Sequence, residues 1–176
     1  SERALAPKVA RHGADEDKHG RIFRALMKKR GLRPVAVPLE TDYTLLLEKH
    51  GIGLAHDKLR RDEPLTVTDL IVYLAHSRVT EQRASEQMAL LCRYFADHQD
   101  IGRAVRMISD DEDNHLAYCH EELLRFARAG HGRTIRRILH ESARAEIRVH
   151  REVSLAVMGH MGRILGWSRA RMALIT

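Results

Sequence analysis

The sequence has few cysteines, prolines and aromatic residues, and each shortage excludes a class of protein. Two cysteines in 176 residues, Cys92 and Cys119, are too few for a disulfide framework or a four-cysteine zinc site. Gly (11) and Pro (4) are too rare for a collagen-like or linker-like chain. The longest apolar run, Leu70 to Ala75, is far shorter than a membrane span, and the first residues lack the apolar core of a signal peptide. A reducing, cytoplasmic compartment is therefore the expected location.

The charge that is present is unevenly distributed. Charged residues make up 31% of the chain and the hydrophobic set 44%, as in globular proteins of about one domain. Residues 124–176 contain eleven Arg and no Lys against three Glu, a net formal charge of +8. Because the whole chain carries +6, the first 123 residues carry −2. The basic C-terminal third is either a solvated helix face or a surface for an acidic partner such as nucleic acid.

Apolar residues recur at intervals of three and four, which predicts an all-α protein. Thr66 is a typical N-cap, and Gly31 and Gly130 are typical helix stops. The expected long helices cover 1–30, 67–97, 98–129 and 134–165, and the last of these is the basic one. Residues 31–66 form a long crossover, interrupted by proline and glycine, in which 44–50 is suited to one short helix. A short turn makes the second and third long helices antiparallel neighbours.

An internal repeat carries the functional information. Asp15-Glu16-Asp17-Lys18-His19 recurs 96 residues later as Asp111-Glu112-Asp113-Asn114-His115, with four of five positions identical. Each copy contains Glu-x-x-His, and residues three apart lie on the same face of a helix. In both helices the Glu and His lie on the same face as the apolar residues. In the helix over 1–30 this apolar face continues to Phe23.

A carboxylate buried on an apolar face loses roughly several kcal/mol of hydration free energy. This loss must be offset by an ion pair or by a bound metal. Two facing pairs offer the carboxylates of Glu16 and Glu112 and the imidazoles of His19 and His115. The helix over 67–97 adds Glu81, which shares its apolar stripe, with Glu86 on a more polar face as a reserve ligand or outer partner. Carboxylate and imidazole ligands suit iron, or manganese, better than thiolate-rich sites do.

This pattern resembles the ferritin-like di-iron carboxylate superfamily. That family is a four-helix bundle with the ligand order Glu, Glu-x-x-His, long crossover, Glu, Glu-x-x-His. The last three quarters of this order match Glu16/His19, the crossover at 31–66, Glu81 and Glu112/His115. The segment Glu81-Gln82-Arg83-Ala84-Ser85-Glu86 also resembles a stretch of bacterial tRNA-modifying di-iron hydroxylases. The resemblance implies one ferritin-like domain over 1–176, with the basic helix as an addition.

The sequence departs from this pattern at the first ligand. The family's first Glu would precede residue 1, so we expect that the N-terminal helix of the bundle is missing from the chain shown. The alternatives are a site with fewer carboxylates, a site shared between subunits, or a ligand from the basic helix, which carries Glu146 and His150. Asp111 is suited either to an outer hydrogen bond on a ligand histidine or to solvent. His12, one turn before Glu16, is expected to be an interior or outer-layer histidine.

The resemblance implies an oxygen-activating oxidoreductase of hydroxylase or oxidase type with a dinuclear iron site. Its partners would be dioxygen or peroxide, an organic or RNA substrate, and an electron donor. Ferrous iron oxidation with iron handling, or peroxide scavenging, are alternatives that use the same site. The competing hypothesis is a metal-free module in which the arginine-rich helix binds nucleic acid and the Glu and His pairs are buried ion pairs. Metal content distinguishes the two classes.

Overall fold

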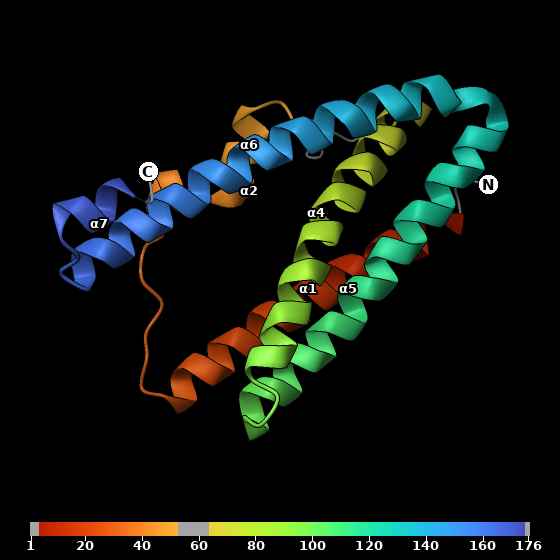
Figure 1. The fold of residues 1–176 in the computed structure, drawn as a ribbon. Helices are drawn as coiled ribbons and strands as arrows, with labels where there is room; N and C mark the ends of the chain where they lie inside the picture. The colour runs from red at the N-terminus through yellow and green to blue at the C-terminus, as the bar shows by residue number, and fades with distance from the viewer. Residues whose placement is uncertain (1–3, 53–63, 175–176) are drawn as a thin grey trace.

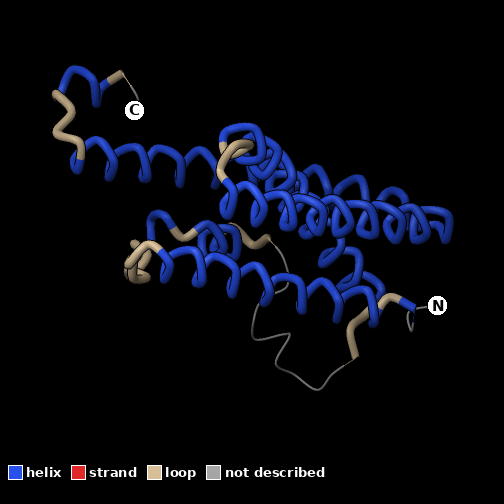
Figure 2. Tube along the Cα trace, turned by 90° about the horizontal axis from the view of Figure 1, so that it is seen from below, coloured by secondary structure: helices blue, strands red, loops and turns tan. Residues whose placement is uncertain are grey.

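The computed structural model describes residues 4–52 and 64–174, and the described residues contain helices and no strand. About 84% of these described residues are helical, which confirms the all-α prediction. Figure 1 shows the arrangement, and Figure 2 shows the same chain by secondary structure. The four long helices are α1 (Ala6–Lys29), α4 (Val67–Tyr94), α5 (Gln99–Phe126) and α6 (Gly132–Ile164). The shorter elements are η2 (Leu39–Thr41), α2 (Tyr43–Lys49), η3 (Ala127–His131) and α7 (Arg169–Ala173).

Local chemistry fixes where the helices begin. Thr66 caps α4 as predicted, because its side chain accepts a hydrogen bond from the Asp69 backbone N–H and Asp69 bonds back to the Thr66 N–H. Helix α5 begins at Gln99, with His98 as its N-cap. The short helix expected in the crossover is α2, one residue earlier than predicted and capped by the Asp42 side chain. Residues 53–63 of the crossover lie outside the described residues.

Helices α4 and α5 are antiparallel neighbours, as predicted, and make the most extensive contact between any two described elements. The turn between them is tight enough to require glycine. A Cβ atom at Gly102 would overlap the Phe95 carbonyl oxygen, so a larger residue there would push the start of α5 away from the end of α4. Helix α1 packs against α5, which places the two Glu-x-x-His segments on neighbouring helices.

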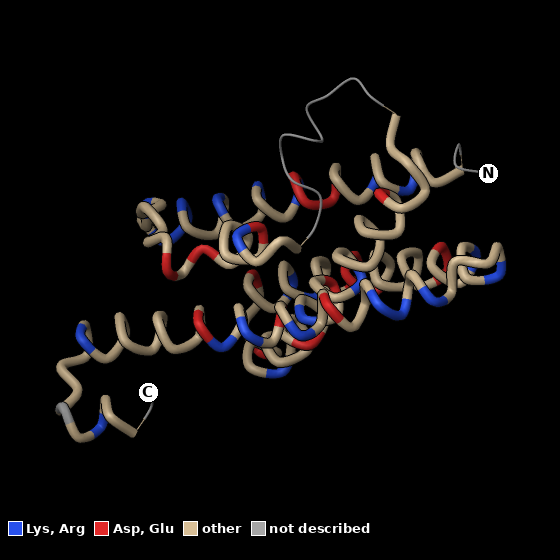
Figure 3. Tube along the Cα trace, turned by 90° about the horizontal axis from the view of Figure 1, so that it is seen from above, with Lys and Arg blue, Asp and Glu red and all other residues tan. Residues whose placement is uncertain are grey.

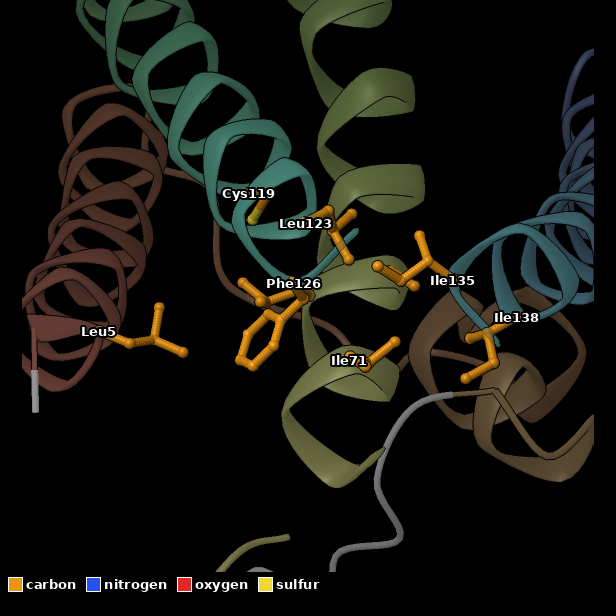
Figure 4. Packing of buried hydrophobic residues seen from close by; sticks show 9 residues of the cluster. Leu5, Ile71, Cys119, Leu123, Phe126, Ile135 and Ile138 are labelled. Atoms are coloured by element: carbon orange, nitrogen blue, oxygen red, sulfur yellow. The ribbon is translucent and has the colours of Figure 1, made fainter. Parts of the chain in front are cut away.

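The hydrophobic core lies where α4, α5 and α6 meet, and Leu5 of the N-terminal segment also contributes to it (Figure 4). The chain passes from α5 to α6 through η3, where Gly130 has φ +98. A positive φ is strained for residues with a Cβ, so Gly130, the predicted helix stop, interrupts the helical backbone between α5, which ends at Phe126, and α6. The cluster consists of Leu5, Ile71, Leu74, Ala75, Cys119, Leu123, Phe126, Ile135 and Ile138. The cluster lies at the end of the α4–α5 pair that is away from the connecting turn, and the predicted metal ligands lie between the cluster and that turn.

Helix α6 packs along α4 with its first half and then extends beside α2 and η2 (Figure 1). It continues through Gly159 and Gly162, which the sequence suggested would weaken it, and ends before Gly166 (φ +62). Among the described elements, α1, α4 and α5 carry the predicted ligands, and α6 is not a fourth helix alongside them. No helix in the described part of the chain is both long enough and apolar enough to span a membrane.

Candidate metal centre

The two Glu-x-x-His pairs face each other across the contact between α1 and α5. His19 Nδ1 on α1 lies 3.5 Å from Glu112 Oε1 on α5. In the other direction, His115 Nδ1 lies 3.8 Å from Glu16 Oε1. Each imidazole therefore reaches the carboxylate of the opposite repeat as well as that of its own.

Helix α4 brings Glu81 to the same place. The Glu81 side chain is 10% exposed, and its Oε2 lies 3.8 Å from His115 Nδ1. The structure thus brings together the five residues that the sequence predicted as ligands, from three helices. It places Glu16 at the rim rather than in the core, because its side chain is 52% exposed. Phe23, expected on the same apolar stripe, is also exposed, so that stripe was predicted too long.

The ligand atoms form two overlapping groups that can each hold a metal ion. One group is His12, Glu16, Glu81 and His115, and the other is Glu16, His19 and Glu112. Within each group all ligand atoms lie within 4.8 Å of one another. Nitrogen and oxygen atoms that each lie about 2.1 Å from a common ion are roughly 3 to 4 Å apart, so small side-chain shifts would complete either site.

Two carboxylates are positioned to bridge the groups. Glu16 is a member of both. Glu112 reaches a histidine of each group, since its Oε1 lies 3.5 Å from His19 Nδ1 and its Oε2 lies 3.3 Å from His115 Nδ1. This donor set, with carboxylates between two imidazole-bearing positions, fits a dinuclear centre of hard or borderline metal ions.

Like charges are crowded in the cluster, which is a second sign that it suits cations. Burial, together with the neighbouring Glu81 carboxylate, raises the pKa of Glu112 to about 7, although a hydrogen bond with His115 opposes this shift. Glu81 itself is buried, which favours its neutral form, but hydrogen bonds from His115 and His12 outweigh burial and lower its pKa. Without a metal, Glu112 thus takes up a proton more readily than an ordinary glutamate, and a divalent cation would replace that proton.

Two histidines of the cluster are held in their charged form by the same carboxylates. Burial alone would lower the pKa of His115, but hydrogen bonds to Glu112, Glu81 and Asp15 raise it to about 10. Burial likewise opposes the charge on His12, and bonds to Glu16 and Glu81 raise its pKa to about 9. The cluster therefore balances its own charge with protons, at positions where metal ions would otherwise sit.

A second layer of hydrogen bonds orients the two predicted histidine ligands. His19 Nε2 lies 3.0 Å from Asp111 Oδ2, and His115 Nε2 lies 3.4 Å from Asp15 Oδ2. Lys18 Nζ joins both aspartates, at 2.9 Å from Asp15 Oδ1 and 2.6 Å from Asp111 Oδ2. With Nε2 so engaged, each ring presents Nδ1 to the carboxylates, the usual way in which an outer carboxylate orients a ligand histidine.

Sequence reasoning identified Asp111 as a candidate for this layer and missed Asp15. The signal was present, because both aspartates are the first residue of the repeated pentapeptide. Each repeat supplies an aspartate that pairs with the histidine of the other copy. The crossed pairing follows from two tertiary features. Helices α1 and α5 are neighbours, and the two motifs lie at the same height along them.

Three other candidate residues lie outside both donor groups. Glu86 is exposed and bonds to Arg83 and Gln82 on its own helix. The arginine-rich helix suggested a solvated Glu146. The residue is instead buried, because its side chain turns inward to Arg83 of α4. His150 lines a separate cavity between α2, α4 and α6.

A cavity of about 330 Å³ adjoins the carboxylate side of the cluster. Glu16, Glu81 and Glu112 line it on one side, and Tyr43 and Leu47 of α2 line it on another. A second cavity, of about 260 Å³, lies on the histidine side and is lined by His12, His115 and Tyr118, among others. The first volume is in the range of small-ligand sites, so a small molecule can approach the three carboxylates from the α2 side.

Comparison with known proteins identifies no relative. No family model matches the chain, and neither a curated protein nor a solved structure does. Any function assigned to the chain therefore depends on the geometry of the two donor groups.

Proposed function

We propose that this protein is a dinuclear iron oxidoreductase that activates dioxygen or peroxide. The single observation that carries the proposal is the pair of donor groups that share Glu16, built from two facing Glu-x-x-His pairs and Glu81. Manganese is the alternative metal, because it accepts the same carboxylate and imidazole ligands. The ligand order along the chain supports membership of the ferritin-like di-iron superfamily, and the chain carries three of the four helical ligand segments of that pattern.

The chain's own residues have defined roles in this proposal. Glu16 and Glu112 would hold both metal ions, and Glu81, His19 and His115 would each complete one of the two positions. Iron held in this way supplies electrons to dioxygen or peroxide. Lys18 and its two aspartates fix the histidine rings, and the cavity beneath α2 admits the oxidant and an organic or RNA substrate. An electron donor is required as a partner for repeated turnover.

The test is an anaerobic ferrous titration of the metal-free protein followed by exposure to dioxygen. We expect about two ions per chain and a new near-ultraviolet absorbance once dioxygen is admitted. A single round of oxygen consumption that needs a reductant to repeat indicates a hydroxylase or oxidase. Continued oxidation of added ferrous ions indicates iron handling, and rapid loss of peroxide indicates scavenging. A protein that binds no iron under these conditions would exclude the whole class.

An exposed row of arginines on α6 favours a second function, the binding of a nucleic-acid backbone. The buried face of the first half of α6 contains Ile135, Ile138, Ser142, Glu146 and Val149. The opposite, exposed face contains Arg133, Arg137, Arg144, Arg148 and Arg151. Figure 3 shows these basic positions along the helix. Among the described residues, Arg137 pairs with Glu141, whereas Arg144 and Arg148 form no ion pair.

The geometry of the row suits the phosphates of a duplex. It covers 18 residue steps of one straight helix, or roughly 27 Å at 1.5 Å per residue. Phe126, a core residue, and Trp167 are the aromatic residues after position 124, so base stacking has little support here. Arginine forms paired hydrogen bonds to phosphate oxygens and keeps its charge at any physiological pH.

We expect the double substitution Arg144→Gln/Arg148→Gln to weaken binding of a fluorescent 20-base-pair duplex. The slope of log affinity against log salt should decrease by about 2, one unit for each lost phosphate contact. The matched control is Arg103→Gln/Arg106→Gln on the exposed face of α5, with the same charge change. Equal losses in both variants would show that general charge, and not the α6 row, attracts the duplex. RNA and DNA duplexes compared in parallel identify the preferred backbone.

A further inference from the structure

His12 occupies a position in the cluster that its sequence context did not reveal. It lies one turn before Glu16 on α1 and is 7% exposed. Its Nε2 atom is 3.2 Å from Glu81 Oε1 and 3.6 Å from Glu16 Oε1. Its ring stacks on that of His115, with 3.9 Å between the ring centres. A third imidazole therefore points at the same carboxylates as the two predicted histidines.

The other nitrogen of His12 is held by an outer partner. Nδ1 lies 2.8 Å from the Tyr118 hydroxyl, so Nε2 is the nitrogen that faces Glu81 and Glu16. His19 and His115 show the same division of roles, with one nitrogen toward an outer oxygen and the other toward the carboxylates. Outer hydrogen bonds of this kind orient ligand histidines in metal sites.

We infer that His12 is a metal ligand and that the two metal positions are unequal. This rests on the proposed dinuclear centre and adds a sixth ligand residue to it. The position with His12 has four donors, two of them imidazoles, and the position with His19 has three. In both positions every donor except the shared Glu16 is buried, so the two differ in donor number and type and not in burial.

The unequal donor sets assign different roles to the two positions. The His12 position binds its ion first and more tightly, because it has one more donor and more nitrogen. The His19 position keeps more open coordination sites. The 330 Å³ cavity is lined by carboxylates of both positions, Glu16, Glu81 and Glu112, whereas His12 and His115 line the opposite one.

Anaerobic Co(II) titration, followed by calorimetry and visible absorption, tests this directly. The unmodified protein should bind two ions in two resolved steps that differ at least about tenfold in affinity. His12→Ala should lose the tight step, with an affinity at least about 100-fold lower, because a direct ligand contributes more than an outer partner does. The control is His76→Ala, another partly buried histidine, which belongs to neither donor group and should titrate like the unmodified protein.

Tyr118→Phe is the second variant, because it keeps the ring and its packing and removes only the hydroxyl that holds Nδ1. The tight step should weaken about tenfold and the weak step should not change. Helical circular dichroism of each variant establishes folding. Two equal steps in the unmodified protein, or an unchanged tight step in folded His12→Ala, would overturn the inference while leaving a dinuclear centre. A protein that binds no Co(II) and no iron would instead contradict the proposed function itself.

Discussion

Replacing Glu112 with alanine is expected to abolish stoichiometric iron loading while the helical fold remains. Glu112 reaches a histidine of each donor group, so its loss removes a ligand from both metal positions at once. The fold should tolerate the change, because this carboxyl is crowded by Glu81 and is not part of the main hydrophobic cluster. Metal counting after anaerobic loading measures the effect, and circular dichroism reports the helix content.

The matched control for this substitution is Glu121→Ala. Glu121 lies on the same helix, and its side chain is 69% exposed beside Lys8. It should load iron like the unmodified protein. Glu112→Gln separates charge from shape, since the amide fills the same space with a much weaker metal ligand, and it should also fail to load. Normal iron content in either Glu112 variant would remove this residue from the site.

Replacing Arg83 with methionine is expected to cause the largest loss of stability of any single change proposed. Arg83 Nε lies 2.9 Å from Glu146 Oε1 and its Nη2 lies 3.1 Å from Oε2, a two-point pair that joins α4 to α6. Tyr43 of α2 also donates to Glu146, at 3.1 Å. Removing the guanidinium leaves a buried carboxylate without its cation. The cost should be about 2 to 4 kcal/mol, less than for a fully buried pair because the Arg83 side chain is 27% exposed.

A double variant distinguishes lost pairing from lost packing. Arg83→Met/Glu146→Leu removes both charges, so urea unfolding should show most of the stability restored. Iron loading should be normal in the double variant, because neither residue belongs to a donor group. A double variant as unstable as Arg83→Met alone would mean that packing and not the unpaired charge causes the loss. Loss of iron in a folded double variant would bring Glu146 back as a ligand.

The pair also explains why Glu146 was misplaced by sequence reasoning. Its neighbours on α6 include Arg144 and Arg148, which suggested a solvated, salt-bridged face. The helical period in fact puts Glu146 on the same face as Ile135, Ser142 and Val149, and that face packs on α4. The charge pattern of α6 alone is compatible with either a solvated or a buried Glu146. Arg83 on α4 provides the cation that stabilises the buried position.

Local features of the sequence were enough to predict the long helices and five of the six residues in the donor groups. Apolar spacing, the Thr66 cap and Gly130 are local features, so they predict where helices lie and which side chains share a face. The repeated pentapeptide placed two glutamates and two histidines on such faces. These conclusions needed no knowledge of how one helix is rotated or shifted against another.

The contacts between side chains of different helices could not be predicted in the same way, because they depend on the tertiary structure. The crossed pairs of Asp15 with His115 and Asp111 with His19 depend on the level at which α1 and α5 contact each other. The place of His12 in a donor group depends on the rotation of α1 toward Glu81 of α4. Periodicity fixes directions within one helix, whereas the offset and rotation between helices follow from how all the core side chains pack together.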